Sequence, residues 1–284
     1  MSEINLNLVR SIVISYIFQI KQTIDLNNLT LATILASNDS SSRTYIKIKT
    51  NMGKKLGINV VNYEVQDTDS LIKTINNLNS DINIHGILVQ MPISNSITNS
   101  PSSILNLINP LKDCDCLTST SLSRIFNNDF DILPAVVRAI LFVLEHLKVE
   151  LKGKVVTIVN NSNLIGLPLS LYLSKMQATV VVLNKYTKNI KNFTLQSDIV
   201  VLATGVGELF DSRYFSENTI VIDVTSIKKG ARVVGDLIVD DNLRKKNIIY
   251  TPVPGGIGPL TVLSLFWNLV KMYQNNFTKN HDST

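Results

Sequence analysis

The 284-residue sequence has little charge and no concentrated block of one sign. Charged residues make up 17%, and the net charge of +5 is spread along the chain without a run of lysine and arginine. Such a mild charge fits a small anionic ligand at least as well as nucleic acid. Basic and aromatic residues do not interleave as they do in single-strand binders. The sequence therefore predicts no nucleic-acid partner.

Cysteine is also scarce, because the sequence has only Cys114 and Cys116, on either side of Asp115. A gap of one residue is wrong for a zinc knuckle and poor for a disulfide. No group of histidine, cysteine and carboxylate residues has metal-ligand spacing. We therefore expect reduced thiols in a cytoplasmic protein and no bound metal.

Long apolar runs are missing as well. The longest one near the start covers residues 11–20, about half of the roughly 20 residues that a membrane-spanning helix needs. It lacks a small-residue cleavage site, and the acidic Glu3 and the scarcity of arginine argue against a signal or transit peptide. The sequence predicts a soluble protein with no membrane segment.

Apolar residues are plentiful, at 45%, and the length suggests two domains. In the first half, the pattern predicts a helix over 4–24, a strand over 29–36, a helix from the low 40s to Leu56, a strand over 58–65, a helix over 70–79 and a strand over 84–91. This alternation is typical of an α/β fold with a parallel, doubly wound sheet.

A polar stretch over about 93–134 breaks this rhythm, and a second α/β pattern then begins. It predicts a helix over 136–148, a strand over 155–159, a helix over 164–175, strands over 179–183, 198–204 and 219–224, and a short strand near Ile248. This order is that of a Rossmann-type domain. A last helix over 260–273 is expected to pack back on the first domain. The predicted domains are therefore 1–135 with 261–284, and 136–260.

One predicted helix carries a lysine beside an apolar stripe. Tyr45, Ile48, Met52 and Leu56 fall at helical spacing, and Lys49 lies one turn after Tyr45. Partial desolvation there would lower the pKa of the lysine and make a neutral amine accessible near neutral pH. The alternative is a lysine at the helix edge whose charged end reaches water, and the spacing alone favours that alternative.

Three other stretches carry candidate residues. Gln90 ends a buried parallel strand, where ligands meet open sheets, although a lone glutamine there is as often an ordinary edge residue. Asp113 and Asp115 alternate in a loop, where solvated carboxylates are the simpler interpretation. The segment TPVPGGIGPLT combines three glycines with three prolines. Such rigid, tight backbone favours close approach to a ligand.

The segments YIKIK, HGILVQMP, PLKDCD and PVPGGIGPLT, in this order and spacing, resemble the bifunctional methylenetetrahydrofolate dehydrogenase/cyclohydrolase family. The resemblance runs from about residue 40 to 268 and includes VIDV and VGD in the second half. It implies a folate cleft between the two domains. It also implies hydride transfer from methylenetetrahydrofolate to a nicotinamide cofactor, hydrolysis of the methenyl product to formyltetrahydrofolate, and a homodimer paired through the second domain.

The resemblance also implies roles for individual residues. Lys49 matches the general acid/base, Gln90 the glutamine that tunes this lysine, and Tyr45 the tyrosine that orients it and packs on the folate. Asp115 matches the aspartate that binds the donor edge of the pterin. The other matches in the folate site are Val89, Met91, Pro254, Gly255, Gly256, Gly258 and Pro259.

The cofactor half departs from the family pattern. The family's Gly-Arg-Ser turn is Asn160-Asn161-Ser162 here, and asparagine cannot replace the arginine that binds the 2′-phosphate of NADP. Asparagine does tolerate positive φ better than other non-glycine residues. Lys185 in the next loop is a candidate for the missing positive charge. The predicted binding residues for NADP, or alternatively NAD, are Asn160, Asn161, Ser162, Gly166, Lys185, Thr204, Gly205 and Ser226.

Three functions remain open from the sequence. The first is the bifunctional enzyme of one-carbon metabolism, and the second is a cyclohydrolase with weak or lost dehydrogenase activity, because water addition needs Lys49 but no nicotinamide. The third is a non-catalytic folate-binding or regulatory subunit. Retention of Tyr45, Lys49, Gln90 and Asp115 argues against the third, since a scaffold has no need of a semi-buried lysine.

Overall fold

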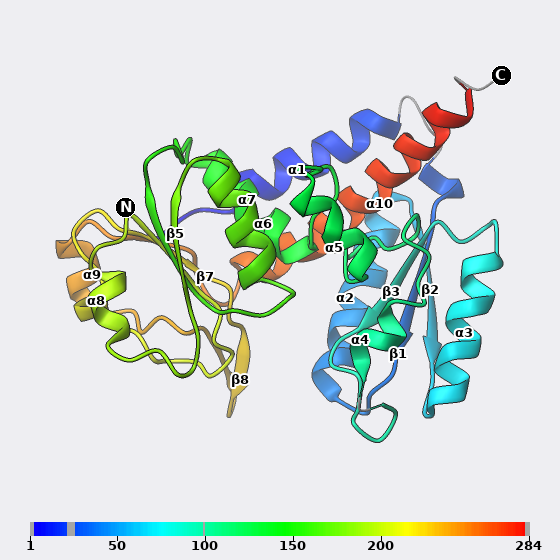
Figure 1. Cartoon of the computed structure of the whole chain (residues 1–284), viewed down its shortest axis with the longest axis horizontal. Coiled ribbons are helices and arrows are strands. Elements are labelled where there is room, and N and C mark those ends of the chain that lie inside the picture. The colour runs from blue at the N-terminus through cyan, green and yellow to red at the C-terminus, as the bar shows by residue number, and fades with distance from the viewer. Residues whose placement is uncertain (1–2, 22–25, 99, 282–284) are drawn as a thin grey trace. The chain divides into compact units, whose positions relative to one another are not determined.

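The computed structural model describes residues 3–21, 26–98 and 100–281. These residues form two compact units (Figure 1). The three-stranded unit comprises the described parts of Ile12–Ala135 and Val262–Thr284, and the five-stranded unit those of Met1–Ser11 and Val136–Thr261. The boundaries fall inside helix α1 (Asn7–Lys21), at the start of α6 (Ala135–His146) and inside α10 (Ile257–His281).

The three-stranded unit has a parallel sheet of order β2-β1-β3. Its strands are β1 (Thr30–Leu35), β2 (Asn59–Glu64) and β3 (Gly86–Gln90), and its crossover helices are α2 (Ser40–Leu56) and α3 (Thr68–Ser80). Asp39 caps the start of α2 by accepting from Ser42 N–H, and Gly57 ends it at φ 70°. The parallel α/β alternation predicted from the sequence is thus confirmed.

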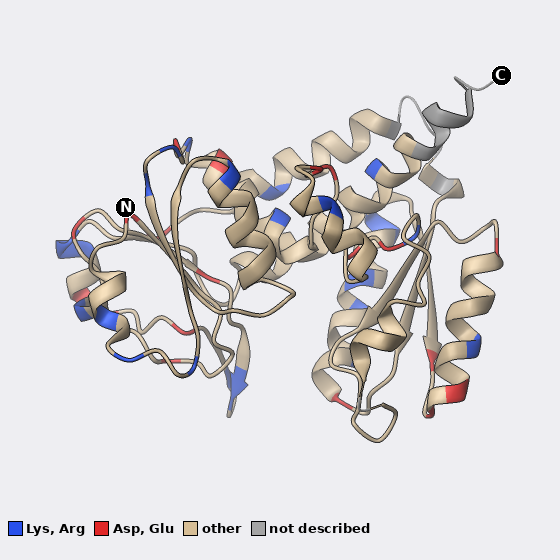
Figure 2. Ribbon diagram, viewed as in Figure 1, with Lys and Arg blue, Asp and Glu red and all other residues tan. Residues whose placement is uncertain are grey.

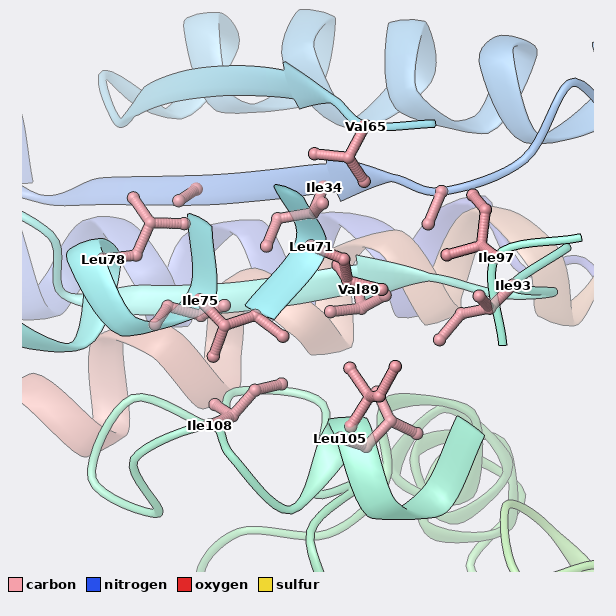
Figure 3. Close-up of a cluster of buried hydrophobic side chains, with 14 of the residues drawn as sticks. Ile34, Val65, Leu71, Ile75, Leu78, Val89, Ile93, Ile97, Leu105 and Ile108 are labelled. Carbon is pink, nitrogen blue, oxygen red and sulfur yellow. The ribbon is translucent and has the colours of Figure 1, made fainter. Parts of the chain in front are cut away.

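The core of this unit lies between the sheet and α3. Leu71, Ile75 and Leu78 repeat at helical spacing and are buried together with Ile34 and Val89 from β1 and β3 (Figure 3). The apolar face of α3 therefore holds the helix against the sheet. This packing fixes the carboxyl end of β3, where Gln90 lies.

Helix α10 completes the three-stranded unit from far along the chain. Asn268 lies on this helix, and its Nδ2 donates to the carbonyl of Cys114 at 2.9 Å and to that of Leu133 at 2.8 Å. Trp267 stacks on Tyr16 of α1, with ring centroids 5.9 Å apart. These contacts tie the loop that contains Asp115 to a helix about 150 residues later.

The five-stranded unit has a parallel sheet of order β10-β7-β6-β4-β5. Its strands are β4 (Val155–Val159), β5 (Thr179–Leu183), β6 (Ile199–Leu202), β7 (Ile220–Asp223) and β10 (Ile249–Tyr250), and its helices include α7 (Gly166–Lys175), α8 (Ile190–Thr194) and α9 (Asp241–Lys245). The chain runs outward from β4 to β5 and then returns to β6 on the other side. The strand order therefore reverses between β4 and β6, and ligands of doubly wound sheets bind at the carboxyl ends of such strands.

Short elements were missed by the sequence analysis. The stretch predicted as irregular contains helices α4 (Pro101–Leu105) and α5 (Ser119–Phe126), and an antiparallel hairpin of β8 (Ile227–Lys229) and β9 (Arg232–Val234) follows β7. Two short 3₁₀ turns, η1 (Leu26–Asn28) and η2 (Ser212–Tyr214), were also not predicted. Elements of three to eight residues carry too few positions for a periodic pattern.

The N-terminal segment lies elsewhere than predicted. Ile4 N–H donates to the carbonyl of Tyr250 at 2.9 Å, and Glu3 forms a parallel bridge with Tyr250. The segment therefore extends the edge of the five-stranded sheet, whereas the predicted division placed it in the first domain. The helix predicted over 4–24 begins at Asn7, and its predicted end lies outside the described residues. No helix in the described ranges is long and apolar enough to span a membrane.

Candidate functional site

Lys49 lies on the buried face of α2. This face consists of Ser42, Ile46, Lys49, Gly53 and Leu56, and only 9% of Lys49 is exposed. The stripe predicted from the sequence was wrong at Ile48, which is 42% exposed. The buried stripe runs one residue further along, so it includes the lysine. The interpretation of Lys49 as a helix-edge residue with a solvated ammonium is therefore wrong.

Gln90 is the hydrogen-bond partner of this lysine. Lys49 Nζ donates to Gln90 Oε1 at 2.5 Å, and Gln90 Nε2 donates to the carbonyl of Met91 at 2.8 Å. An ammonium or amine Nζ can offer N–H groups to the amide oxygen, while the amide nitrogen must find an acceptor elsewhere. The contact with Met91 therefore fixes which end of the Gln90 amide faces Lys49.

Burial shifts the pKa of Lys49 and the pKa of Asp115 in opposite directions, and the charge of each residue opposes the shift of the other. Desolvation lowers the pKa of Lys49, and the negative charge of Asp115 only partly offsets this. Desolvation also raises the pKa of Asp115 to about 6, against the opposing effect of Lys49 and of a hydrogen bond from Ala135 N–H at 3.3 Å. Asp115 is therefore a half-buried carboxylate coupled to Lys49, and its interpretation as a solvated turn residue is wrong.

The neighbours of Asp115 have structural roles. Asp113 is buried and accepts hydrogen bonds from Leu117 N–H at 3.0 Å and from Thr118 N–H at 2.8 Å, so it holds the loop before α5. Cys114 and Cys116 are free, buried thiols whose pKa values are raised by desolvation. Both thiols are therefore protonated at neutral pH and are poor nucleophiles.

The other predicted folate residues of this unit differ in what they expose. Tyr45 is half-buried on α2, one helical turn before Lys49. Met91 is half-buried directly after Gln90. The side chain of Val89 belongs to the core under α3 (Figure 3). Because neighbouring residues of a strand point to opposite faces of a sheet, the Gln90 side chain points away from this core. Val89 can therefore offer a ligand only its backbone.

The glycine- and proline-rich turn after β10 belongs to the five-stranded unit. Gly255 adopts φ +98°, and a Cβ on Gly256 would lie 2.2 Å from the carbonyl oxygen of Pro252, so both positions require glycine. Arg10 Nη2 donates to the carbonyl of Gly255. Gly258, followed by Pro259 in the first turn of α10, has open space around its Cβ position. A cavity of about 450 Å³ borders this turn, and Arg10 and Gly255 are among its lining residues.

The predicted cofactor turn joins β4 to α7, beside the point where the strand order reverses. A Cβ on Gly166 would lie 2.0 Å from the carbonyl oxygen of Asn160, so the helix starts directly against the turn. Neither Asn160 nor Asn161 is among the residues with positive φ, so tolerance of positive φ is not what asparagine supplies here. Asn160 Oδ1 accepts from Ser162 N–H at 2.8 Å and from Gly166 N–H at 3.1 Å.

A buried carboxylate that the sequence analysis missed organises the neighbouring loop after β6. Asp236 is fully buried and accepts hydrogen bonds from Thr204 N–H at 2.7 Å, Thr204 Oγ1 at 2.6 Å, Gly207 N–H at 3.0 Å and Thr225 Oγ1 at 2.7 Å. Thr225 Oγ1 also accepts from Gly205 N–H at 3.0 Å. In the sequence, the VGD segment that contains Asp236, which forms part of the family resemblance, could have pointed to this residue.

Lys185 and Ser226 are both exposed. Because Val159 and Leu183 are paired in the sheet, the loop that contains Lys185 starts beside the turn after β4. The Lys185 ammonium lies 5.0 Å from the centre of the Tyr186 ring. Lysine and arginine residues are scattered over both units, with one group on the β8 strand (Figure 2). In the described ranges, no group of histidine, cysteine and acidic residues could hold a metal ion.

These features define a two-unit α/β protein with a dinucleotide-binding fold in one unit and a buried lysine–glutamine–carboxylate group in the other. Family models agree with both halves. The tetrahydrofolate dehydrogenase/cyclohydrolase catalytic domain matches residues 9–115, and the NAD(P)-binding domain of the same family matches residues 134–277. The chain therefore belongs to the tetrahydrofolate dehydrogenase/cyclohydrolase family.

Individual relatives agree with this assignment. The chain is 36% identical over 241 residues to the bifunctional protein FolD of Lactobacillus gasseri, covering 84% of each chain. Its structure is similar to that of the bifunctional enzyme FolD from Campylobacter jejuni, with a TM-score of 0.84, 30% identity and coverage of 94% of this chain and 96% of the other. The Trypanosoma brucei FolD, solved with NADP cofactor and inhibitor, has a TM-score of 0.85, 27% identity and 95% coverage of both chains.

Proposed function

We propose that the chain oxidises methylenetetrahydrofolate to methenyltetrahydrofolate with NAD(P) and hydrolyses the product to formyltetrahydrofolate. The observation that carries this proposal is the buried Lys49, held by Gln90 and coupled to Asp115. Burial of a lysine opposes folding, because a buried ammonium loses its hydration, so a purely structural role is a poor reason for keeping it. This cost argues against a purely structural folate-binding subunit.

Lys49 is suited to act as the base in the hydrolysis. Burial lowers its pKa and so makes the neutral amine more accessible than in a solvated lysine, and a neutral amine does not repel the cationic methenyl group. The oxygen of water forms a bond to the methenyl carbon while its proton passes to Nζ. The resulting ammonium is stabilised by Gln90 Oε1, and it returns the proton to the ring nitrogen when the carbon–nitrogen bond opens. The remaining hydroxyl proton is released to solvent as the formyl carbonyl forms.

Asp115 and Tyr45 are suited to position the folate. With a pKa of about 6, the Asp115 carboxylate is mostly ionised at neutral pH and can accept two N–H groups from the amino-pyrimidinone edge of a pterin. Tyr45, one turn before Lys49, offers an aromatic surface. Met91 and the turn from Pro254 to Pro259 are proposed as further folate contacts, together with the backbone of Val89.

The five-stranded unit has the features that a dinucleotide needs. Gly166 brings α7 against the end of β4, and Asp236 holds Thr204 and Gly205 in a loop at the end of β6. We propose that these residues, with Asn160, Asn161, Ser162 and Ser226, line the NAD(P) site. A nicotinamide held there would supply the hydride acceptor for the oxidation. Lys185 is the proposed partner of the 2′-phosphate of NADP, and NAD remains the alternative cofactor.

A hydrolase with weak dehydrogenase activity is the second candidate. The observation that favours it is the hydrogen bonding of Asn160 to its own turn, which satisfies donors that a cofactor phosphate would use. We also propose that the chain forms a homodimer, as the family resemblance implies. The two buried free thiols support a reducing compartment such as the cytoplasm.

Three assays on the purified protein test the proposal. Oxidation of methylenetetrahydrofolate is measured with NADP and with NAD, and hydrolysis of supplied methenyltetrahydrofolate is measured without a nicotinamide. We expect activity in the hydrolysis assay and with at least one cofactor. Activity in hydrolysis alone would select the second candidate, and folate binding without any activity would refute both.

A pair of lysine variants assigns the activity to the proposed site. Lys49→Ala should abolish hydrolysis. Lys47→Ala removes a lysine from the same helix at an exposed position and should leave hydrolysis unchanged. Equal losses in the two variants would contradict the role of Lys49.

A further inference from the structure

The N–H groups of the turn between β4 and α7 donate to oxygen atoms of the same turn. Asn160 directly follows β4, and its Oδ1 accepts from Ser162 N–H at 2.8 Å, from Ser162 Oγ at 2.6 Å and from Gly166 N–H at 3.1 Å. An amide oxygen has two lone pairs. Three donors therefore leave no acceptor capacity unused on this side chain.

The other amides at the start of α7 are satisfied in the same way. Ser162 Oγ accepts from Ile165 N–H at 3.2 Å, and the carbonyl of Ser162 accepts from Leu167 N–H at 3.1 Å. Together with the N–H groups of Ser162 and Gly166, four N–H groups in residues 162–167 therefore donate to oxygens of the turn itself. These are the type of group that binds phosphate at a helix N-terminus.

The Asn160 side chain is also anchored at its other end. Asn160 Nδ2 donates to the carbonyl of Ala203 at 2.8 Å, and Ala203 directly follows β6. The amide therefore bridges the two strands between which the order of the sheet reverses. This is the place where a doubly wound domain holds the pyrophosphate of a dinucleotide.

We propose that the Asn160 amide oxygen occupies the position of a pyrophosphate oxygen, so that Asn160 sets the affinity for the dinucleotide. A cofactor phosphate gains the N–H groups of Ser162 and Gly166 only when the amide moves away and also leaves Ala203. The inference rests on the proposed dehydrogenase activity and goes beyond it, because it assigns a negative contribution to one residue of the cofactor site.

The test compares the dissociation constant for NADPH, measured from the change in its fluorescence on binding, in the wild type and in Asn160 variants. Asn160→Gly removes the amide and frees both N–H groups, so we expect about ten-fold tighter binding, which corresponds to about 1.4 kcal/mol. Asn160→Ala should change the affinity in the same direction. Asn160→Asp keeps an acceptor and adds a negative charge, so it should weaken binding.

The expected changes in NADPH affinity have opposite signs in these variants, and this distinguishes the proposal from a purely structural role of Asn160. If Asn160 only supported the turn, all three variants would bind NADPH more weakly. Asn163→Gly introduces the same backbone freedom at an exposed position in the same turn and should not tighten binding. Unchanged or weaker binding by both Asn160→Gly and Asn160→Ala would overturn the inference.

Hydrolysis of methenyltetrahydrofolate distinguishes the two possible failures. It requires no nicotinamide, so variants that retain it are folded and their NADPH affinities are interpretable. A wild type that neither hydrolyses nor oxidises folate would refute the proposed function. Intact hydrolysis with no gain in NADPH affinity on removal of the Asn160 amide would refute only the inference.

Discussion

Two replacements of Gln90 should move the pH dependence of hydrolysis in opposite directions. If Lys49 is the base, kcat/KM rises with pH as its ammonium loses a proton, and the midpoint of this rise reports the pKa of Lys49 in the free enzyme. Gln90 Oε1 accepts a hydrogen bond of 2.5 Å from Lys49 Nζ. This contact stabilises the ammonium more than the amine, because hydrogen bonds to charged groups are the stronger ones.

The expected shifts follow from the energy of this contact. A hydrogen bond to a charged group contributes about 1.5–3 kcal/mol, and a neutral one roughly half as much. Gln90→Leu therefore costs the ammonium about 0.8–1.5 kcal/mol more than it costs the amine. At about 1.4 kcal/mol per pKa unit, the midpoint should fall by about half a pH unit to one pH unit. Gln90→Glu places a negative charge beside Nζ and should raise the midpoint by about one to three units.

The assay follows the loss of methenyltetrahydrofolate over a range of pH values, with the enzyme-free rate subtracted at each pH. Gln66→Glu makes the same charge change at an exposed position of the same unit, so its midpoint should match the wild type. The height of each profile can fall in the Gln90 variants, because the lysine also loses its orientation. Midpoints that stay in place, or that move in the same direction in both variants, would refute the assignment of Lys49 as the base.

Three further changes test other parts of the site. Asp115→Asn tests the raised pKa of about 6 of this carboxylate. The stability of the wild type relative to this variant should be greatest below about pH 4 and should fall as the pH rises through 6, by up to about 3 kcal/mol. Denaturant unfolding at several pH values measures it, and a constant difference would contradict it. Lys185→Ala should raise the Michaelis constant for NADP much more than that for NAD. Lys188→Ala changes an exposed lysine nearby and should leave the Michaelis constants for both cofactors unchanged. Equal effects of Lys185→Ala on both cofactors would refute the proposed contact. Gly166→Ala places a Cβ 2.0 Å from the Asn160 carbonyl oxygen, so thermal unfolding should show a loss of about 1–3 kcal/mol, and an unchanged melting temperature would contradict the geometry.

The alternation of strands and helices could be predicted because each long element carries its own pattern. In α3, apolar residues recur at helical spacing, and β3 and β6 are continuous apolar runs typical of buried parallel strands. The β8–β9 hairpin gave no such signal, since each strand has three residues and is largely exposed. The position of the N-terminal segment depends on one main-chain contact with Tyr250, which no local pattern encodes.

The sequence predicts that Lys49 lies beside an apolar stripe of α2, but it places that stripe one residue too early. The sequence pattern counts apolar residues, and it therefore selected Ile48, which is exposed. The face that is buried instead contains Ser42 and Gly53, whose small size lets α2 approach the sheet closely. A Cβ on Gly53 would lie 2.4 Å from Val60 of β2. Small residues at close contacts carry no apolar signal, so the depth of the lysine became visible only in the folded chain.

Long-range contacts decided the remaining site residues. Asp115 is half-buried because its loop is held by α10, whose Asn268 donates to the carbonyl of Cys114. Asp236 gathers the loop after β6 and Thr225 after β7, over separations of 11 to 32 residues. Local sequence describes neither arrangement. The family resemblance pointed to Asp115, but it did not describe the burial that raises the pKa of this carboxylate.

The two proposed reactions make different demands on this chain. In the proposed mechanism, hydrolysis uses Lys49, Gln90 and Asp115, which belong to one unit. Oxidation would in addition require the turn at Asn160 in the other unit, where we propose that the amide competes with a cofactor phosphate for the N–H groups of Ser162 and Gly166. A change confined to this turn can therefore alter the rate of oxidation without altering the chemistry of hydrolysis. If the proposal holds, the series of Asn160 variants should change the ratio of the two activities while the pH profile of hydrolysis stays constant.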